Sequence, residues 1–133
     1  MTVRVEEVSG YNDDARHVAR FMRQSDRDEL WALGRTLAHD AIRQSLAVST
    51  EAYIAYDDDE PIAVFGANIP ALGSFGVPWL LGTPGVDHRA REYFPWGRRF
   101  IEHLLTQCDT LQNMASADNR KTLVFLSRLG FDI

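Results

Sequence analysis

The chain has 133 residues, of which 45% are hydrophobic and 25% charged, the balance of a soluble globular protein rather than a disordered or fibrous one. Its 14 Lys and Arg against 19 Asp and Glu give a net charge of −5, which argues against nucleic-acid binding. With no long apolar run, no signal-peptide core at the N-terminus and the single Cys108, we expect one cytoplasmic domain over residues 1–133, without a membrane span or an internal disulfide.

The first fifty residues predict one strand and three helices. Thr2–Val8 alternates apolar and polar residues, which is the period of a half-buried strand. Three amphipathic helices follow. The cluster Asn12–Asp14 is expected to cap the first, a capping box at Ser25–Asp28 opens the second, Gly34 ends it, and Thr36 caps the third.

The middle of the chain predicts strands. Ala52–Tyr56 and Pro61–Phe65 are β-prone runs that flank four consecutive acidic residues, so we expect a hairpin with Pro61 at the start of its second strand. The acidic turn Asp57–Glu60 lacks the alternating ligands and the glycine of a calcium loop, and we interpret it as a solvated turn. Val77–Leu81 is a short apolar run typical of a buried strand.

The last third predicts a long helix, a weak strand and a final helix. The long helix covers about Asp87–Gln107, and Pro95 should kink it or start a second helix there. Leu111–Ala117 is the weak strand candidate. The final helix begins at a cap, Asp118 or Asn119, and ends at Gly130 with Phe131 folded back onto it; a short strand could follow from Phe131. This order indicates an α/β (α+β) fold, a mixed twisted sheet of about six strands with helices on both faces.

Particular segments resemble a known family. The run from Asn119 to Phe131, Asn-Arg-Lys-Thr-Leu-Val-Phe-Leu-Ser-Arg-Leu-Gly-Phe, resembles the closing helix of the GCN5-related N-acetyltransferases (GNAT), and so does the order of elements after Ala52. Glu29–Gly34, Pro61–Gly66 and Gly76–Thr83 are similar to a small group of phage-encoded GNAT-like proteins, often labelled internal virion proteins.

The GNAT resemblance implies an acetyl-CoA site beside the fourth strand, with the pyrophosphate at the start of the following helix. Free N–H groups and the positive dipole end at a helix N-terminus favour such an anion. The positions that the resemblance assigns to the cofactor are Leu80, Leu81, Gly82, Thr83, Gly85, His88, Arg89, Arg91 and Asn119.

The chain also departs from the family pattern. The stretch Gly82–Arg91 lacks the usual order of Gln or Arg, two residues, Gly, one residue, and Gly or Ala, and its Asp87 opposes an anion. The family's proton-donating Tyr falls on Leu126, and Ser74–Leu81 holds no acid for the common general base. The sequence therefore assigns no catalytic residue.

Each candidate also has a structural interpretation. Asp87 as a helix cap with His88 exposed is the one we favour, whereas pyrophosphate binding and simple solvation are equally good explanations of Arg89 and Arg91. Asn119 as a helix cap would contribute about 1 kcal/mol, and Trp79 fits a core anchor. No metal site is expected, because the other three histidines lack ligand spacing: His17, His39 and His103.

Two functions follow from these observations, with a third between them. The first is a GNAT-like acyl-CoA-dependent N-acetyltransferase, in which an amine acceptor attacks the thioester and N–H groups near Leu80 and Leu81 steady the oxyanion. The second is an inactive GNAT-fold phage structural, assembly or host-interaction protein with phage or host protein partners, in the host cytoplasm or the virion. The third is a module that binds acyl-CoA or another anion without reaction. Any of them allows a homodimer. Plugging of the crevice by Trp79, Tyr93 or Phe94 would favour the scaffold.

Overall fold

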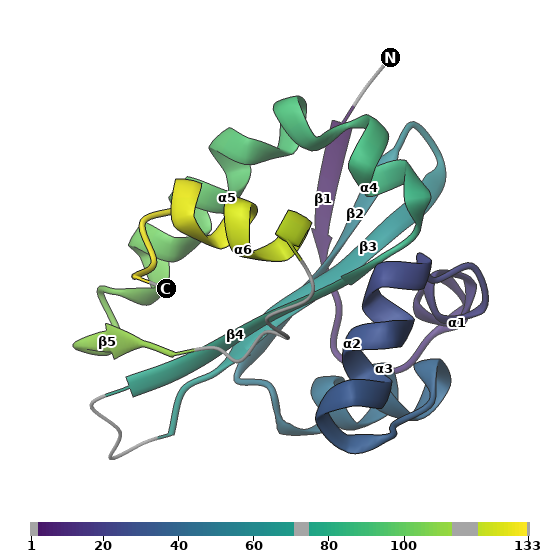
Figure 1. Ribbon diagram of the computed structural model, residues 1–133, viewed down its shortest axis with the longest axis horizontal. Helices are drawn as coiled ribbons and strands as arrows, with labels where there is room; N and C mark the ends of the chain where they lie inside the picture. Colours follow the sequence, from purple (N-terminus) through teal and green to yellow (C-terminus); the bar gives the residue numbers. More distant parts are fainter. Residues whose placement is uncertain (1–2, 71–74, 113–119, 133) are drawn as a thin grey trace.

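A mixed sheet runs through the centre of the molecule (Figure 1). The computed structural model describes residues 3–70, 75–112 and 120–132. Their strands pair in the order β1-β2-β3-β4-β5; the first four are antiparallel neighbours, and β5 lies parallel to β4. The strands are β1 (Val3–Glu7), β2 (Glu51–Asp57), β3 (Glu60–Asn68), β4 (Phe75–Gly82) and β5 (Thr110–Leu111). The predicted fold class is confirmed, with five strands in these residues where about six were expected.

Helices cover both faces of this sheet, as the order of elements predicted (Figure 1). One face carries α1 (Asp13–Arg20), α2 (Gln24–Gly34) and α3 (Ala38–Val48), and the other carries α4 (Pro84–His88), α5 (Ala90–Leu104) and α6 (Arg120–Arg128). In the described part of the chain, no helix is both long and apolar enough to cross a membrane.

Alternation along the strands divides the apolar side chains between two cores. Ala52, Ile54 and Tyr56 of β2 belong to the larger core under α1–α3, whereas Ala55 belongs to the smaller one on the opposite face. The larger core is completed by fully buried side chains from helices and strands, among them Val18, Ile42 and Val64. Burial of these apolar groups fixes which face of each strand meets which helices.

Helix ends set by local chemistry agree with the sequence. The Asn12 side chain accepts a hydrogen bond from the Ala15 N–H at 2.8 Å and caps α1. After α6, Gly130 adopts φ 105°, and the Phe131 N–H bonds the Leu126 carbonyl oxygen at 3.0 Å. This is the predicted glycine terminator with Phe131 folded back.

Caps predicted for the second and third helices are wrong. Arg23 precedes α2 and Leu37 precedes α3, and neither helix has a side-chain cap. The capping-box residue Asp26 instead directs its carboxylate to another element, the end of β4. α2 ends at Gly34 as expected, but the left-handed residue that follows it is Arg35, at φ 54°, and not a glycine.

The predicted hairpin is confirmed, and the long helix is corrected. β2 and β3 pair across Asp57–Glu60, with Pro61 in the second position of β3. The expected Asp87–Gln107 helix begins at Pro84, because Thr83 caps it, and is interrupted at Arg89; Pro95 lies inside α5.

The C-terminal predictions are met in part. β5 covers only the start of the expected Leu111–Ala117 strand, and its later residues lie outside the described ranges, as do the expected caps Asp118 and Asn119. Phe131 and Asp132 are not in a strand, so the expected final strand is absent from the described C-terminal residues.

Candidate functional site

β4 and β5, the two strands that follow the hairpin, pair over only a short stretch. β5 pairs only with Phe75 and Gly76 at the start of β4, where the Gln112 N–H bonds the Gly76 carbonyl oxygen at 2.9 Å. Beyond Gly76, β4 continues toward α4 while β3 stays paired to its other side (Figure 1). Within the described ranges, this stretch of β4 has no strand on its second edge, which we call the free edge.

Alternation of the backbone decides which groups face the free edge. The Gly76 carbonyl points away from β3 to β5, and both backbone groups of Gly82 also bond outside β3. The Thr83 N–H, one residue on, bonds the Ile62 carbonyl oxygen of β3 at 2.8 Å. The backbone N–H and C=O groups of even-numbered residues of β4 therefore point to the free edge, and those of odd-numbered residues point to β3.

Leu80 is consequently the N–H donor of the free edge between Gly76 and Gly82, because Pro78 has no N–H. Leu81, named with it from the sequence, turns its backbone toward β3, and its side chain lies in the larger core at 8% exposure. The structure thus separates the two predicted donors and leaves Leu80 at the edge.

The end of β4 is clamped by the start of α2, a contact that sequence reasoning missed. The Arg23 N–H bonds the Gly82 carbonyl oxygen at 2.8 Å, and the Gly82 N–H bonds Asp26 Oδ2 at 2.8 Å. Arg23 Nε reaches the same Asp26 oxygen at 2.8 Å, and its Nη1 reaches Asp87 Oδ1 on α4 at 2.9 Å. Side-chain exposure rises from 7% at Asp26 through 16% at Arg23 to 38% at Asp87.

Two opposing effects act on the pKa of Asp26, which bonds both Arg23 and the end of β4. Burial raises the pKa of the Asp26 carboxyl above its usual value, and the Arg23 guanidinium and the Gly82 N–H act against that shift. Only the sequence pattern of a capping box singled out Asp26, and that pattern assigned its carboxylate to the wrong partner.

The turn Gly82–Gly85 is compact because its glycines touch neighbouring elements. A Cβ at Gly82 would lie 2.7 Å from Val86 Cγ2, and one at Gly85 would lie 2.8 Å from Ile62 Cγ2. Thr83 is 4% exposed, and its hydroxyl accepts a hydrogen bond from the Gly85 N–H at 3.2 Å. Close packing of α4 on β3 is therefore sufficient reason for both glycines.

The remaining predicted cofactor residues are scattered around α4. His88 and Arg91 are exposed. Arg89 is engaged: its Nε pairs with Asp57 Oδ2 at 3.0 Å and its Nη1 with Glu92 Oε1 at 3.6 Å, which ties the α4–α5 junction to the hairpin. Asn119 lies outside the described residues.

Aromatic residues considered as plugs are engaged in packing. Trp79 packs against the larger core, as expected of an anchor, and its Nε1 donates to Ser49 Oγ at 2.7 Å. Tyr93 donates to the Tyr56 carbonyl oxygen at 2.7 Å, and Phe94 meets the Phe125 ring of α6 edge to face.

Among the described residues, groups for proton transfer are sparse on β4 and at its end. Leu126 is half-buried on α6, and β4 carries no acidic residue. The two carboxylates linked to the end of β4, those of Asp26 and Asp87, both pair with Arg23. Among the described residues, no group of three His, Cys, Asp or Glu side chains is arranged to hold a metal ion.

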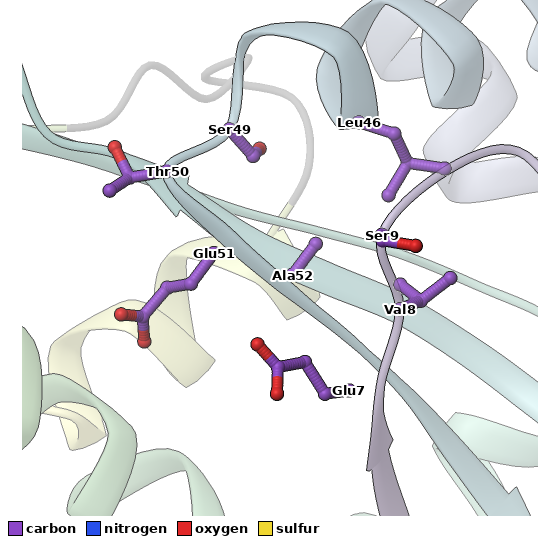
Figure 2. Close-up of a pocket in the computed structure, with 8 residues that line it drawn as sticks. All are labelled: Glu7, Val8, Ser9, Leu46, Ser49, Thr50, Glu51 and Ala52. Carbon is purple, nitrogen blue, oxygen red and sulfur yellow. The ribbon is translucent and has the colours of Figure 1, made fainter.

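A separate hollow of about 460 Å³ lies at the opposite edge of the sheet, where β1 ends beside the start of β2 (Figure 2). Its polar groups are largely engaged by the protein. Ser49 Oγ donates to the Ser45 carbonyl, Thr50 Oγ1 accepts from the Ile69 N–H, and Glu51 pairs with His103 at 2.9 Å. This hollow is therefore a weaker ligand site than the free edge.

Comparisons with known proteins agree with the geometry of the fold. No family model and no curated protein matches the sequence. A Bacillus subtilis acetyltransferase solved in complex with CoA superposes with a TM-score of 0.69 at 16% identity, over 99% of this chain and 78% of that one. PaiA N-acetyltransferase from Thermoplasma acidophilum, in complex with coenzyme A, gives 0.66 at 14% identity, over 100% and 91%.

A GNAT-family acetyltransferase from Streptococcus pneumoniae TIGR4 gives a TM-score of 0.63 at 16% identity, over 99% of this chain and 89% of that one. At such low identities the likeness concerns the fold. The chain has the GNAT fold, as its sequence predicted.

Proposed function

We propose that this GNAT-fold chain is an acyl-CoA-dependent N-acetyltransferase that binds acetyl-CoA along the free edge of β4. The observation that carries the proposal is the edge itself: Leu80 offers an N–H and Pro78 a carbonyl oxygen at the place where β4 and β5 separate. The pantetheine arm of CoA contains two amides and can bond to such an edge as an added strand does. Solved proteins of the same fold are complexes with CoA.

The reaction that fits this site is direct transfer. A neutral amine attacks the thioester carbonyl carbon, the C–S bond breaks, and the CoA thiolate leaves. An edge N–H such as that of Leu80 would stabilise the negative charge that develops on the carbonyl oxygen. Because Leu126 cannot donate a proton, the proton lost by the amine would pass to the thiolate through water.

For the diphosphate we propose the turn Gly82–Gly85 with His88 and Arg91, and for a pantetheine amide we propose Asn119. His88 and Arg91 follow the turn in the sequence and are exposed, so both are accessible to an anion. Arg89 is the least suited of the predicted residues, because Asp57 and Glu92 already hold its guanidinium.

A second candidate is a GNAT-fold protein without turnover, such as a phage structural or assembly protein with phage or host partners. Two observations favour it. Leu126 replaces the family's acid, and carboxylates neutralise both Arg23 and Arg89 around the turn where a diphosphate would bind.

Calorimetric titration of the purified chain with acetyl-CoA, with desulfo-CoA and ADP as controls, tests the proposal. Micromolar binding, about −8 kcal/mol, followed by release of the CoA thiol with a panel of primary amines, is the expected result. Binding without thiol release across that panel would identify a non-reacting binder. No heat and no thermal stabilisation at millimolar ligand would refute the CoA site and favour the scaffold.

A further inference from the structure

Arg23 lies across the turn to which the diphosphate is assigned. Its own N–H is bonded to Gly82, the first residue of the turn, at 2.8 Å. Its guanidinium reaches Asp87, beyond the other end of the turn, at 2.9 Å. Backbone and side chain of Arg23 therefore span the turn from one end to the other.

The guanidinium has an inner and an outer side. Nε faces Asp26, whose side chain is 7% exposed, while Nη1 faces Asp87, whose side chain is 38% exposed. Asp26 orients the guanidinium, and the pair with Asp87 is exposed to solvent. A phosphate accepts the same parallel hydrogen bonds from a guanidinium as a carboxylate does.

Arg89 differs in each of these respects. It pairs with Asp57 of the β2–β3 hairpin at 3.0 Å and with Glu92 of its own helix at 3.6 Å. The pair with Asp57 holds the α4–α5 junction to the sheet, and the pair with Glu92 is local to the start of α5; neither contact extends across the turn.

We infer that Arg23, rather than Arg89, joins Arg91 in binding the diphosphate of acyl-CoA, and that Asp87 occupies the Arg23 guanidinium until the diphosphate replaces it. This inference rests on the proposed function and deepens it. Asp87 acts as an internal competitor in two ways: it occupies Nη1, and its charge repels the incoming diphosphate.

Substitution of the competitor is the direct test. Asp87→Asn removes one negative charge at a partly exposed position, and it should tighten binding of CoA and of ADP by roughly five- to tenfold. Asp40→Asn is the matched control, because Asp40 forms an exposed pair with Arg43 at 3.6 Å on α3, away from the turn. Its affinities should stay within about twofold of the wild type.

Two conservative variants separate the arginines. Arg23→Lys keeps the charge but loses the planar fork, so its affinity for ADP should fall at least about fivefold. Arg89→Lys should lose distinctly less. Thermal unfolding of each variant establishes that it is folded before titration, and Asp87→Asn tests the inference even where Arg23→Lys does not fold.

The outcomes separate the inference from the function beneath it. If wild type binds CoA and Asp87→Asn binds no tighter, or if Arg89→Lys loses as much as Arg23→Lys, the inference is overturned while the CoA site stands. If neither wild type nor Asp87→Asn binds CoA or ADP at millimolar concentration, the proposed function fails, and this inference fails with it.

Discussion

Replacing Leu80 by proline removes the backbone N–H that points to the free edge of β4. Proline is tolerated where a strand's N–H is outside the ladder, and Pro78 already occupies the equivalent position two residues earlier. Leu80→Pro also deletes a half-buried side chain that packs against the smaller core of Ala55, Ile62 and Ala63. Leu80→Ala is therefore the reference variant, since it loses the same packing but keeps the N–H.

The magnitude follows from one hydrogen bond. A neutral N–H bonded to a ligand carbonyl contributes about 0.5–1.5 kcal/mol net, which is roughly two- to tenfold in Kd. Acetyl-CoA should thus bind Leu80→Pro about two- to tenfold more weakly than Leu80→Ala. Turnover, if the same N–H stabilises the oxyanion, should fall by up to about 100–1,000-fold.

Stability provides the internal control. Urea unfolding should place Leu80→Pro within about 1 kcal/mol of Leu80→Ala, whereas Leu81→Pro, which removes an N–H that faces β3, should prevent folding. Equal affinity of the two Leu80 variants for acetyl-CoA would refute the role of this N–H. Failure of Leu80→Pro to fold would refute its assignment to the free edge.

Two further substitutions test the surroundings of the site. Tyr56→Phe removes the bond from the buried phenol to Asp14 Oδ2 at 2.6 Å and should cost about 2 kcal/mol at pH 7 in urea unfolding. Burial and that bond raise the pKa of Tyr56 from 10.0 to about 12. The contribution of the protonated phenol to the free energy of unfolding is therefore complete below pH 10 and is lost as the pH rises through 12. Over that window the variant should lose stability less steeply than wild type, by about 1.4 kcal/mol per pH unit, and parallel profiles would contradict the shift. Gly82→Ala places a Cβ 2.7 Å from Val86 Cγ2 and should cost about 1–3 kcal/mol; Gly10→Ala, with open space around its Cβ, should be close to neutral, and equal effects of the two would refute the contact.

Local features of this protein are determined by the sequence itself. Alternation in Thr2–Val8 indicates a half-buried strand, because a two-residue period suits a pleated surface. The short apolar run Val77–Leu81 indicates a buried strand. The predicted capping cluster Asn12–Asp14 begins α1, and Gly130 follows α6 as predicted, because capping and left-handed conformations depend on neighbours a few residues away. From such local elements the order of strands and helices could be predicted, and the resemblance of that order and of the run Asn119–Phe131 to the GNAT family indicated the fold.

Tertiary structure alone decided the candidate site. Asp26 and Gly82 are 56 residues apart, and Arg23 and Asp87 are 64 apart, so no local pattern links either pair. The Asp26 carboxylate bonds the buried Gly82 N–H instead of an N–H of its own helix. A buried N–H without a partner costs more free energy than one at an exposed helix end, which water can satisfy. Arg89 likewise pairs with Asp57, which is 32 residues away in the sequence, so the sequence alone does not show that its guanidinium is engaged. Composition can supply charged groups, but which of them remain available to a ligand is decided only when packing has chosen their partners.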